Sequence, residues 1–227
     1  MNVKLLIEEV IQSLGNNEDF ESVKNKIQII SRLLKNKDFS EWVNKEFIFG
    51  YNSIDTLPDY RKLKLLEVKA DFIVPSFGGV MKYTKHRVPV ENLGRDKFNK
   101  ISSCKIIDSV PILQDLLKKN GSLCVGLTPN ELYDVQEVLS GCQIMQAHKI
   151  LGYSQIKNII NYAKGKLIDI FVDFNDTLFD GNLDINKKEK EISDIIINAG
   201  IVQTGNGILK VVKSNSIGGN NNNPKLG

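Results

Sequence analysis

The sequence predicts an α+β protein with an N-terminal helical bundle, a central β-hairpin or small antiparallel sheet, and a long C-terminal helix that packs both together. Three observations support this prediction. Apolar residues recur at helical spacing over residues 1–50. Two stretches rich in β-branched and aromatic residues flank a Gly-rich turn at residues 76–79. A long amphipathic stretch then begins at Ser154.

Three helices are expected in the N-terminal part. The first ends at Gly15, the second begins near Asp19, and Asp38 or Ser40 caps the third. Brief connections between short helices are typical of a small bundle. The positions that recur at helical spacing or that these helices carry are Val3, Leu6, Val10, Leu14, Phe20, Val23, Ile27, Ile30, Leu34, Phe39, Trp42, Val43, Glu46 and Phe47. Trp42, Phe47, Phe49 and Tyr51 are expected to form the seam between the third helix and the hairpin.

The hairpin is expected from Leu63–Pro75 and Val80–Val90. Gly78 and Gly79 supply the positive φ angles that a tight turn needs. Pro89 cannot donate a backbone hydrogen bond, so it places the second strand at a sheet edge or near its own end.

The rest of the chain reads as alternating elements. We expect a helix over Val110–Lys119, a strand over Ser122–Leu127 and a helix start at Thr128–Glu131. Gln143–Leu151 fits a strand or a helix equally well. Ser154 is expected to cap the long helix, whose apolar face is Ile156, Ile159, Ile160, Ala163, Leu167, Ile170, Phe171 and Phe174.

The expected domain covers residues 1–200, with a helical part over 1–50 and a hairpin-containing mixed part over 58–200. Residues 201–227 read as a Gly/Asn-rich β-like segment followed by a flexible tail or linker. The composition, with 41% hydrophobic and 25% charged residues, is that of a globular protein with a sizeable core.

Charge and cysteine content narrow the function classes. The net charge of +3 and the pI of about 8.6 are too small for a dedicated nucleic-acid-binding domain. Three cysteines without CxxC spacing predict neither a disulfide framework nor a thiolate zinc site. The N-terminus has no pattern of a secretion signal or membrane span. We therefore expect a cytoplasmic protein with no membrane partner.

No catalytic residue, metal site or cofactor can be assigned from the sequence. Residues 170–180 resemble the first motif of haloacid-dehalogenase-like phosphatases, with Asp173 at the nucleophile position. Asn175 stands where that motif needs a second aspartate, and the apolar spacing stays helical, so the end of a long helix is the better interpretation. The histidines His86 and His148 form no recognisable catalytic arrangement. Gly205–Gly207 lacks the rest of a dinucleotide-binding loop.

Basic residues gather around the hairpin. Lys62 and Lys64 are expected on one strand face, and Lys85 and Arg87 on one face of the return strand. Together with Arg61 they form a candidate binding patch for RNA, DNA or an acidic protein. A solvated face that protects the sheet edge is the simpler alternative. Arg61 also has a structural interpretation, as a partner of Asp59 or Glu46.

The stretch from Asp38 to Arg61 resembles the AbiTii domain of bacterial abortive-infection proteins. Trp42, Glu46 and Gly50-Tyr51 match the family's Trp-x-x-x-Glu helix that ends in Gly-Tyr. The run Leu57-Pro58-Asp59-Tyr60-Arg61 matches its Leu-Pro-x-Tyr-Arg. The chain departs from the family at residues 47–49, where Phe-Ile-Phe replaces the usual Glu-Leu-Asn.

The resemblance implies a role in phage defence, and it assigns no catalytic residue. We expect an interaction, sensing or oligomerisation module whose partner is a protein or a second copy of the chain. Two alternatives stay open at this point: a toxic effector enzyme such as a nuclease, and a nucleic-acid-binding module that uses the basic hairpin.

Overall fold

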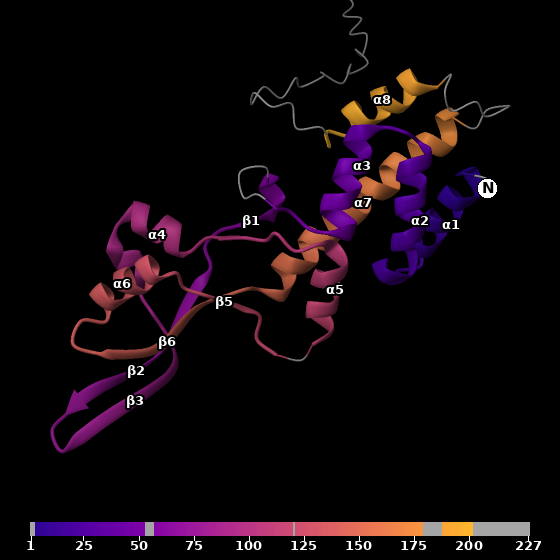
Figure 1. Cartoon of the computed structure of the whole chain (residues 1–227). Coiled ribbons are helices and arrows are strands. Elements are labelled where there is room, and N and C mark those ends of the chain that lie inside the picture. The colour runs from indigo at the N-terminus through magenta and orange to yellow at the C-terminus, as the bar shows by residue number, and fades with distance from the viewer. Residues whose placement is uncertain (1–2, 53–56, 120, 179–187, 202–227) are drawn as a thin grey trace, which may run out of the picture.

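The computed structural model describes residues 3–52, 57–119, 121–178 and 188–201. These residues form an elongated molecule, with a helical unit at one end and a mixed unit of sheet and helices at the other (Figure 1). Each unit has its own cluster of buried hydrophobic side chains. The predicted α+β fold is therefore confirmed.

The helical unit contains α1 (Val3–Gly15), α2 (Phe20–Leu33), α3 (Lys37–Val43), α5 (Val110–Lys118), α7 (Tyr153–Leu178) and α8 (Glu189–Asn198). The first three helices lie where the apolar spacing predicts them. The predicted cap of α3 is wrong, because Asn36 holds that position and its Oδ1 accepts a hydrogen bond from the backbone N of Phe39 at 3.0 Å. Both Asp38 and Ser40 lie inside the helix.

The long helix α7 forms one wall of the helical core. All eight residues of its predicted apolar face are buried, and α7 contacts α1, α5 and α8. The predicted cap Ser154 is wrong, since α7 begins at Tyr153 and Ser154 lies in its first turn. These buried residues belong to the core of the helical unit alone. The expectation that this helix packs both units together is therefore wrong.

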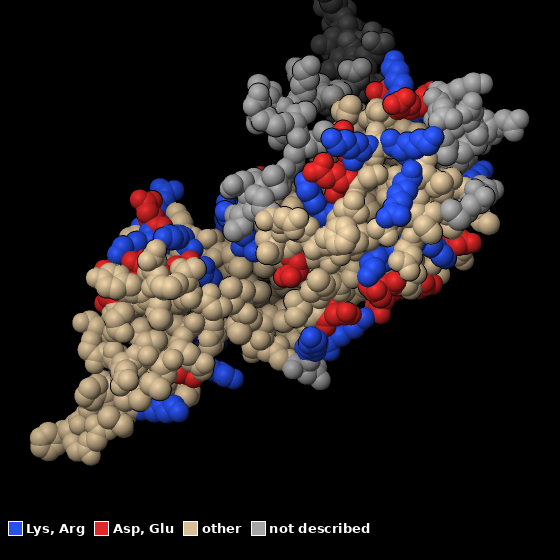
Figure 2. All heavy atoms as spheres, viewed as in Figure 1, with Lys and Arg blue, Asp and Glu red and all other residues tan. Residues whose placement is uncertain are grey.

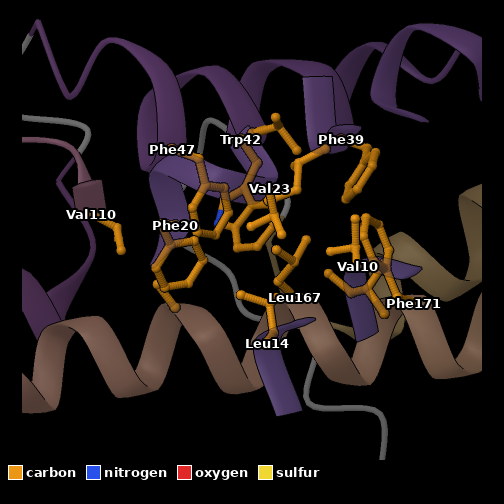
Figure 3. Close-up of a cluster of buried hydrophobic side chains, with 14 of the residues drawn as sticks. Val10, Leu14, Phe20, Val23, Phe39, Trp42, Phe47, Val110, Leu167 and Phe171 are labelled. Atoms are coloured by element: carbon orange, nitrogen blue, oxygen red, sulfur yellow. The ribbon is translucent and has the colours of Figure 1, made fainter. Parts of the chain in front are cut away.

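Aromatic side chains fill the centre of the helical core (Figure 3). The ring of Phe47 lies 5.2 Å from that of Phe20 and 5.3 Å from that of Trp42, measured between centroids. Phe39 meets the ring of Phe174 on α7 at 5.6 Å. Trp42 and Phe47 therefore pack inside the helical unit, and their predicted role as a seam with the hairpin is wrong.

The mixed unit is built on a four-stranded antiparallel sheet in the order β3-β2-β6-β5. Its strands are β2 (Glu67–Ser76), β3 (Gly79–Arg87), β5 (Cys124–Gly126) and β6 (Gln143–Ile150). Residues 143–150, which the sequence left undecided, thus form a strand. The short helix η3 (Val90–Leu93) and the helices α4 (Arg95–Ile101) and α6 (Pro129–Val138) supply buried residues to the same core as Val68, Ala70 and Phe72 of β2.

The predicted hairpin is confirmed as β2 and β3. Ser76 pairs with Gly79, and Gly78 takes a φ of 92° at the turn. β3 is an edge strand, and it ends before Pro89, as expected. Its register with β2 shifts between Ala70 and Phe72, where Lys85 takes a φ of 50°. This irregularity bends the strand and interrupts the alternation of its faces.

The two units are joined by antiparallel connecting segments. β1 (Lys62–Leu63) pairs with β4 (Cys104–Lys105). The pairing extends on either side, because the backbone N of Ile106 donates to the carbonyl O of Arg61 at 2.9 Å and that of Leu66 donates to Ser102 at 2.8 Å. Residues 61–66 and 102–106 therefore form a joint between the helical unit and the mixed unit.

Two further observations concern the sequence motifs. The phosphatase-like segment continues α7 through Leu178, so it does not form the strand that this motif requires. Among the described helices, none combines the length and the apolar character needed to cross a membrane. Gly205–Gly207 and the Gly/Asn-rich tail lie outside the described residues.

Candidate functional site

The matched AbiTii-like residues meet at the joint, on the side of the helical unit. Helix α3 continues into a π-helical turn, η1 (Asn44–Ile48), in which the backbone N of Phe49 donates to the carbonyl O of Asn44 at 2.8 Å. π-Helical turns are rare and occur frequently at functional sites. This turn carries Glu46, whose side chain is completely buried.

Arg61 reaches Glu46 from a second turn. Pro58 has the extended conformation, with φ −66° and ψ 154°, and the 3₁₀ turn η2 (Asp59–Arg61) follows it. The fixed φ of proline sets the direction in which the chain enters this turn. The Arg61 side chain is also completely buried.

Glu46 and Arg61 form a buried ion pair. Arg61 Nη2 lies 2.5 Å from Glu46 Oε2, and Arg61 Nε donates to the same carboxylate at 3.2 and 3.3 Å. Arg61 Nη1 donates to the backbone carbonyls of Ile106 at 3.2 Å and Asp108 at 2.7 Å. The guanidinium therefore has partners on all three of its nitrogen atoms. Burial disfavours its charge, but Glu46 more than compensates, so the pKa of Arg61 is raised.

Two tyrosines complete what we call the Glu46–Arg61 cluster. The hydroxyls of Tyr51 and Tyr60 both donate to Glu46 Oε1. Burial raises the pKa of each phenol well above 10.0, and the neighbouring Glu46 carboxylate adds to the rise. The Tyr60 ring also stacks on Tyr162 of α7, with 4.2 Å between ring centroids. The cluster thus joins η1, η2, the segment after β4 and α7.

Gly50 allows the chain to reach this arrangement. Its φ is 84°, and a Cβ atom at this position would lie only 2.6 Å from the carbonyl O of Ile107. The same carbonyl accepts a hydrogen bond from the backbone N of Tyr51 at 2.8 Å. Only a residue without a side chain fits both the backbone conformation and this close approach. The turn then directs Tyr51 into the cluster.

Phe49 lies outside this packing, so the prediction that it belongs to a buried seam is wrong. Its side chain is 71% exposed. Ile107 and Ile112 on the adjoining segments are 43% and 46% exposed. We refer to Phe49, Ile107 and Ile112 as the Phe49 patch. Phe49 follows η1 directly, and the carbonyl O of Ile107 accepts the backbone hydrogen bond of Tyr51, so both residues adjoin parts of the buried cluster.

The predicted basic patch is not assembled as the sequence suggested. Lys62 lies in β1 and pairs with Asp59 at 2.8 Å, while Lys64 lies between β1 and β2. Neither belongs to the hairpin, so the expectation that they share a face of its first strand is wrong. Lys85 and Arg87 do lie on β3, and Arg87 pairs with Glu91 at 2.8 Å. The Arg61 side chain is completely buried, so it adds nothing to a surface patch.

A second buried ion pair was not predicted. Lys149 of β6 lies 2.9 Å from Glu131 of α6, and its Nζ donates to the carbonyl O of Ser103 at 2.6 Å. Glu131 also accepts a hydrogen bond from the backbone N of Thr128 at 3.0 Å, within a capping box. Burial opposes its charge, but Thr128 and Lys149 outweigh that effect and lower the pKa of Glu131. The sequence signal was the Thr-x-x-Glu motif, which marks the helix start but does not identify Lys149.

The remaining candidates form no further site. His86 is exposed beside Phe72 and Tyr83, and His148 lies on β6. All three cysteines are free, and burial raises the pKa of the Cys104 thiol, which disfavours a reactive thiolate. Among the described residues, no group of three or more His, Cys, Asp or Glu side chains is placed to hold a metal ion. An open cavity of about 260 Å³ beside β2 is lined by Leu65, Leu66, Glu67, Val68, Arg87, Val88, Val90, Glu91 and Phe98.

The geometry determines what the cluster can do chemically. Neither Glu46 nor Arg61 is exposed, so a substrate cannot reach the ion pair in this conformation. A charged pair that is both desolvated and hydrogen-bonded fixes the geometry of the segments that carry it. The pair connects η1 of the helical unit to Arg61 and, through Arg61, to the backbone carbonyls of Ile106 and Asp108.

Comparison with known proteins supports the motif match. The AbiTii family model matches residues 5–198, a range that includes both units and the joint. No curated protein and no solved structure gives a significant match.

Proposed function

Because the chain belongs to the AbiTii family of abortive-infection phage-defence proteins, we propose that it acts in defence as a non-catalytic interaction module. Its partner is a protein or a second copy of the chain, and its site of action is the bacterial cytoplasm. The module senses a phage product or an effector, or it oligomerises.

The observation that carries this proposal is that the side chains of the Glu46–Arg61 cluster are buried and bonded to one another. Glu46, Gly50, Tyr51, Tyr60 and Arg61 are among the residues that match the family motifs, together with Trp42, Leu57 and Pro58. Glu46 and Arg61 are fully buried and bonded to each other, and both tyrosine hydroxyls are bonded to Glu46. Catalytic side chains must contact a substrate, whereas these side chains contact each other. The family-specific residues therefore support an architectural role.

The Phe49 patch is where we place the interaction. Exposed apolar side chains that cluster on a protein surface mark interaction sites more often than isolated ones. Here Phe49 follows directly on the π-helical turn that holds Glu46, and the backbone of Tyr51 is bonded to Ile107. The cluster thus fixes the backbone on which the patch is displayed. A partner that binds the patch would therefore contact a surface whose backbone shape depends on the Glu46–Arg61 cluster.

The first test separates an interaction module from an enzyme. The purified protein is incubated with RNA, DNA and nucleotides, with and without divalent metal ions, and products are analysed by gel electrophoresis and chromatography. The proposal expects no turnover under any condition. Cleavage or hydrolysis that copurifies with the protein and is lost in a folded point variant would overturn it in favour of a toxic enzyme.

The second test concerns the patch. Phe49→Asn combined with Ile107→Thr should remove protection of phage-challenged cells while the purified protein keeps its thermal unfolding midpoint. The matched control is Leu5→Thr, because Leu5 is also exposed, at 53%, and lies on α1. Equal protection by the patch variant and the wild type would contradict the assignment of the interaction to this surface.

The nucleic-acid alternative has its own test. Of the predicted patch, only Lys85 and Arg87 lie on the hairpin, and Lys85→Gln combined with Arg87→Gln removes both cations. Salt-dependent binding to RNA or DNA that this variant loses would favour the alternative, because phosphate contacts release counterions. If the wild type binds neither RNA nor DNA, the nucleic-acid alternative is excluded.

A further inference from the structure

The β2–β3 hairpin projects from the mixed unit at the end of the molecule that lies opposite the helical unit (Figure 1). Its outer part is uncharged, since residues 72–81 contain no Asp, Glu, Lys or Arg. Phe77 at the turn is fully exposed, Val80 is 69% exposed and Met81 is 48% exposed. We call these three residues the hairpin tip. Such a convex apolar surface is costly in water unless something covers it.

Cationic side chains follow directly behind the tip on the edge strand. In the described part of the chain, Lys82 and Lys85 form no ion pair, whereas Arg87 and Lys69 each have a carboxylate partner. The nearby Asp71 is engaged on both oxygens, by the backbone N of Lys85 at 2.6 Å and by Gln146 at 2.5 Å. Figure 2 shows an uncharged tip, with lysine or arginine side chains set back from it.

We propose that the hairpin tip inserts into the surface of an anionic lipid bilayer. Phe77, Val80 and Met81 would enter the boundary between headgroups and acyl chains, and Lys82 and Lys85 would meet the lipid phosphates. Apolar burial combined with electrostatic attraction is the combination by which peripheral proteins bind anionic membranes. The hairpin does not span the bilayer. This proposal goes beyond the interaction at the Phe49 patch and does not depend on it. The sequence-based expectation of no membrane partner was drawn from the lack of a secretion signal or membrane span, and the proposal concerns binding at the bilayer surface.

Shape and charge favour this occupant over others. A symmetric contact between two copies through this surface would bring Lys82 and Lys85 of both copies into one interface, without added carboxylates to neutralise them. A nucleic acid would use the two lysines but leave Val80 and Met81 in water. A bilayer needs no complementary pocket, because it is fluid, and it accommodates both the convex apolar tip and the charges behind it.

The experiment is flotation of the purified full chain with vesicles. One set contains equal parts of phosphatidylcholine and phosphatidylglycerol, and the other contains phosphatidylcholine alone. The wild type should float with the anionic vesicles only, and less at high salt. Phe77→Ser combined with Val80→Ser should weaken binding at least about tenfold, because two buried apolar side chains are removed. Lys82→Gln combined with Lys85→Gln should also weaken it.

The control variants replace exposed residues that lie away from the tip. Tyr133, which is 69% exposed on α6, is replaced by Ser, and the exposed Lys157 on α7 is replaced by Gln. Both variants should bind as the wild type does. Phe77→Trp adds a direct probe of insertion, because the natural Trp42 is buried in the helical core. Its fluorescence should shift to shorter wavelength with anionic vesicles and become protected from iodide.

Three results would overturn the lipid proposal. One is that the folded wild type binds neither vesicle. A second is that binding depends on the lysines but not on Phe77 and Val80, because this would indicate electrostatic adsorption without insertion. The third is that the tip variant loses phage defence although the wild type never binds lipid, which assigns the tip to a protein partner. This last result would leave the Phe49 patch and the proposed defence module untouched.

Discussion

The carboxylate of Glu46 and the guanidinium of Arg61 meet with 2.5 Å between Oε2 and Nη2, and neither side chain is exposed to solvent. Glu46 is carried by the helical unit, and Arg61 begins the joint to the mixed unit. Arg61 also donates to the carbonyls of Ile106 and Asp108 on the return segment. One ion pair therefore fixes three stretches of chain that are distant in sequence.

Replacing Arg61 by Gln should lower the free energy of unfolding by about 3–5 kcal/mol, because it leaves Glu46 buried without its countercharge. Urea denaturation followed by circular dichroism measures the loss. The double variant Glu46→Leu/Arg61→Met should lose less unfolding free energy than the single variants Glu46→Leu and Arg61→Met lose in sum. The reason is that the double variant leaves no uncompensated buried charge.

The matched control is Lys62→Gln. Lys62 also pairs with a carboxylate, that of Asp59 at 2.8 Å, but this pair is exposed. Exposed pairs contribute little, so the denaturation midpoint should stay almost unchanged. If Arg61→Gln were as harmless as Lys62→Gln, the Glu46–Arg61 cluster would not be the element that holds the joint.

The tyrosines of the cluster should make the protein sensitive to alkaline pH. The pKa values of Tyr51 and Tyr60 are raised above 10.0 in the folded protein, mainly by burial. Their contribution to stability is therefore fully present below pH 10, and it is lost as the pH rises further, because the unfolded chain then ionises first. The difference in unfolding free energy between the wild type and Tyr51→Phe/Tyr60→Phe should shrink above pH 10. A difference that stays constant between pH 8 and pH 11 would contradict the raised pKa values.

Much of the fold could be predicted from local sequence patterns. The spacing of Val10, Leu14 and Ile27 predicts helices whose buried faces the structure confirms. Gly78 and Gly79 identify the hairpin because a tight turn needs positive φ angles that other residues avoid. In each case the signal and the structure it predicts lie within a few residues of each other.

The errors concern contacts between distant residues. Trp42 and Phe47 were expected to pack against the hairpin, but they pack in the helical core. The sequence could not distinguish the two, because apolar burial is non-directional and does not specify which surface a side chain contacts. The Lys149–Glu131 pair joins a strand to a helix 18 residues away, and only the glutamate had a local motif. Lys62 and Lys64 were assigned to the hairpin because the strand start at Glu67 is not marked by any turn residue.

The buried pair Lys149–Glu131 should make the mixed unit sensitive to acid. The pKa of Glu131 is lowered below 4.5 in the folded protein. Its contribution is therefore present at neutral pH and is lost as the pH falls through the folded-state pKa. Glu131→Gln should cost about 3 kcal/mol at pH 7, because Lys149 stays buried without a countercharge. The gap between variant and wild type should narrow below pH 4.5, as unfolding curves at several pH values would show.

The control for this pair lies on the same helix. Glu137 is exposed and pairs with Lys97 at 2.7 Å, so Glu137→Gln should leave the midpoint nearly unchanged at both neutral and acid pH. An acid-dependent gap of the same size for Glu137→Gln would mean that general charge repulsion, and not the buried pair, sets the response to acid.

Gly50 should tolerate no side chain, and Gly78 provides the comparison that shows why. Both have positive φ, 84° and 92° respectively. A Cβ at Gly50 would lie 2.6 Å from the carbonyl O of Ile107, whereas no atom lies within 4 Å of one at Gly78. Gly78→Ala should therefore cost only the backbone strain, about 1–2 kcal/mol. Gly50→Ala should cost more, because the segment after β4 must also move away and its hydrogen bonds to Tyr51 and Arg61 weaken. Thermal unfolding of both variants measures the difference, and equal losses would show that close approach to Ile107 adds nothing to the requirement for glycine.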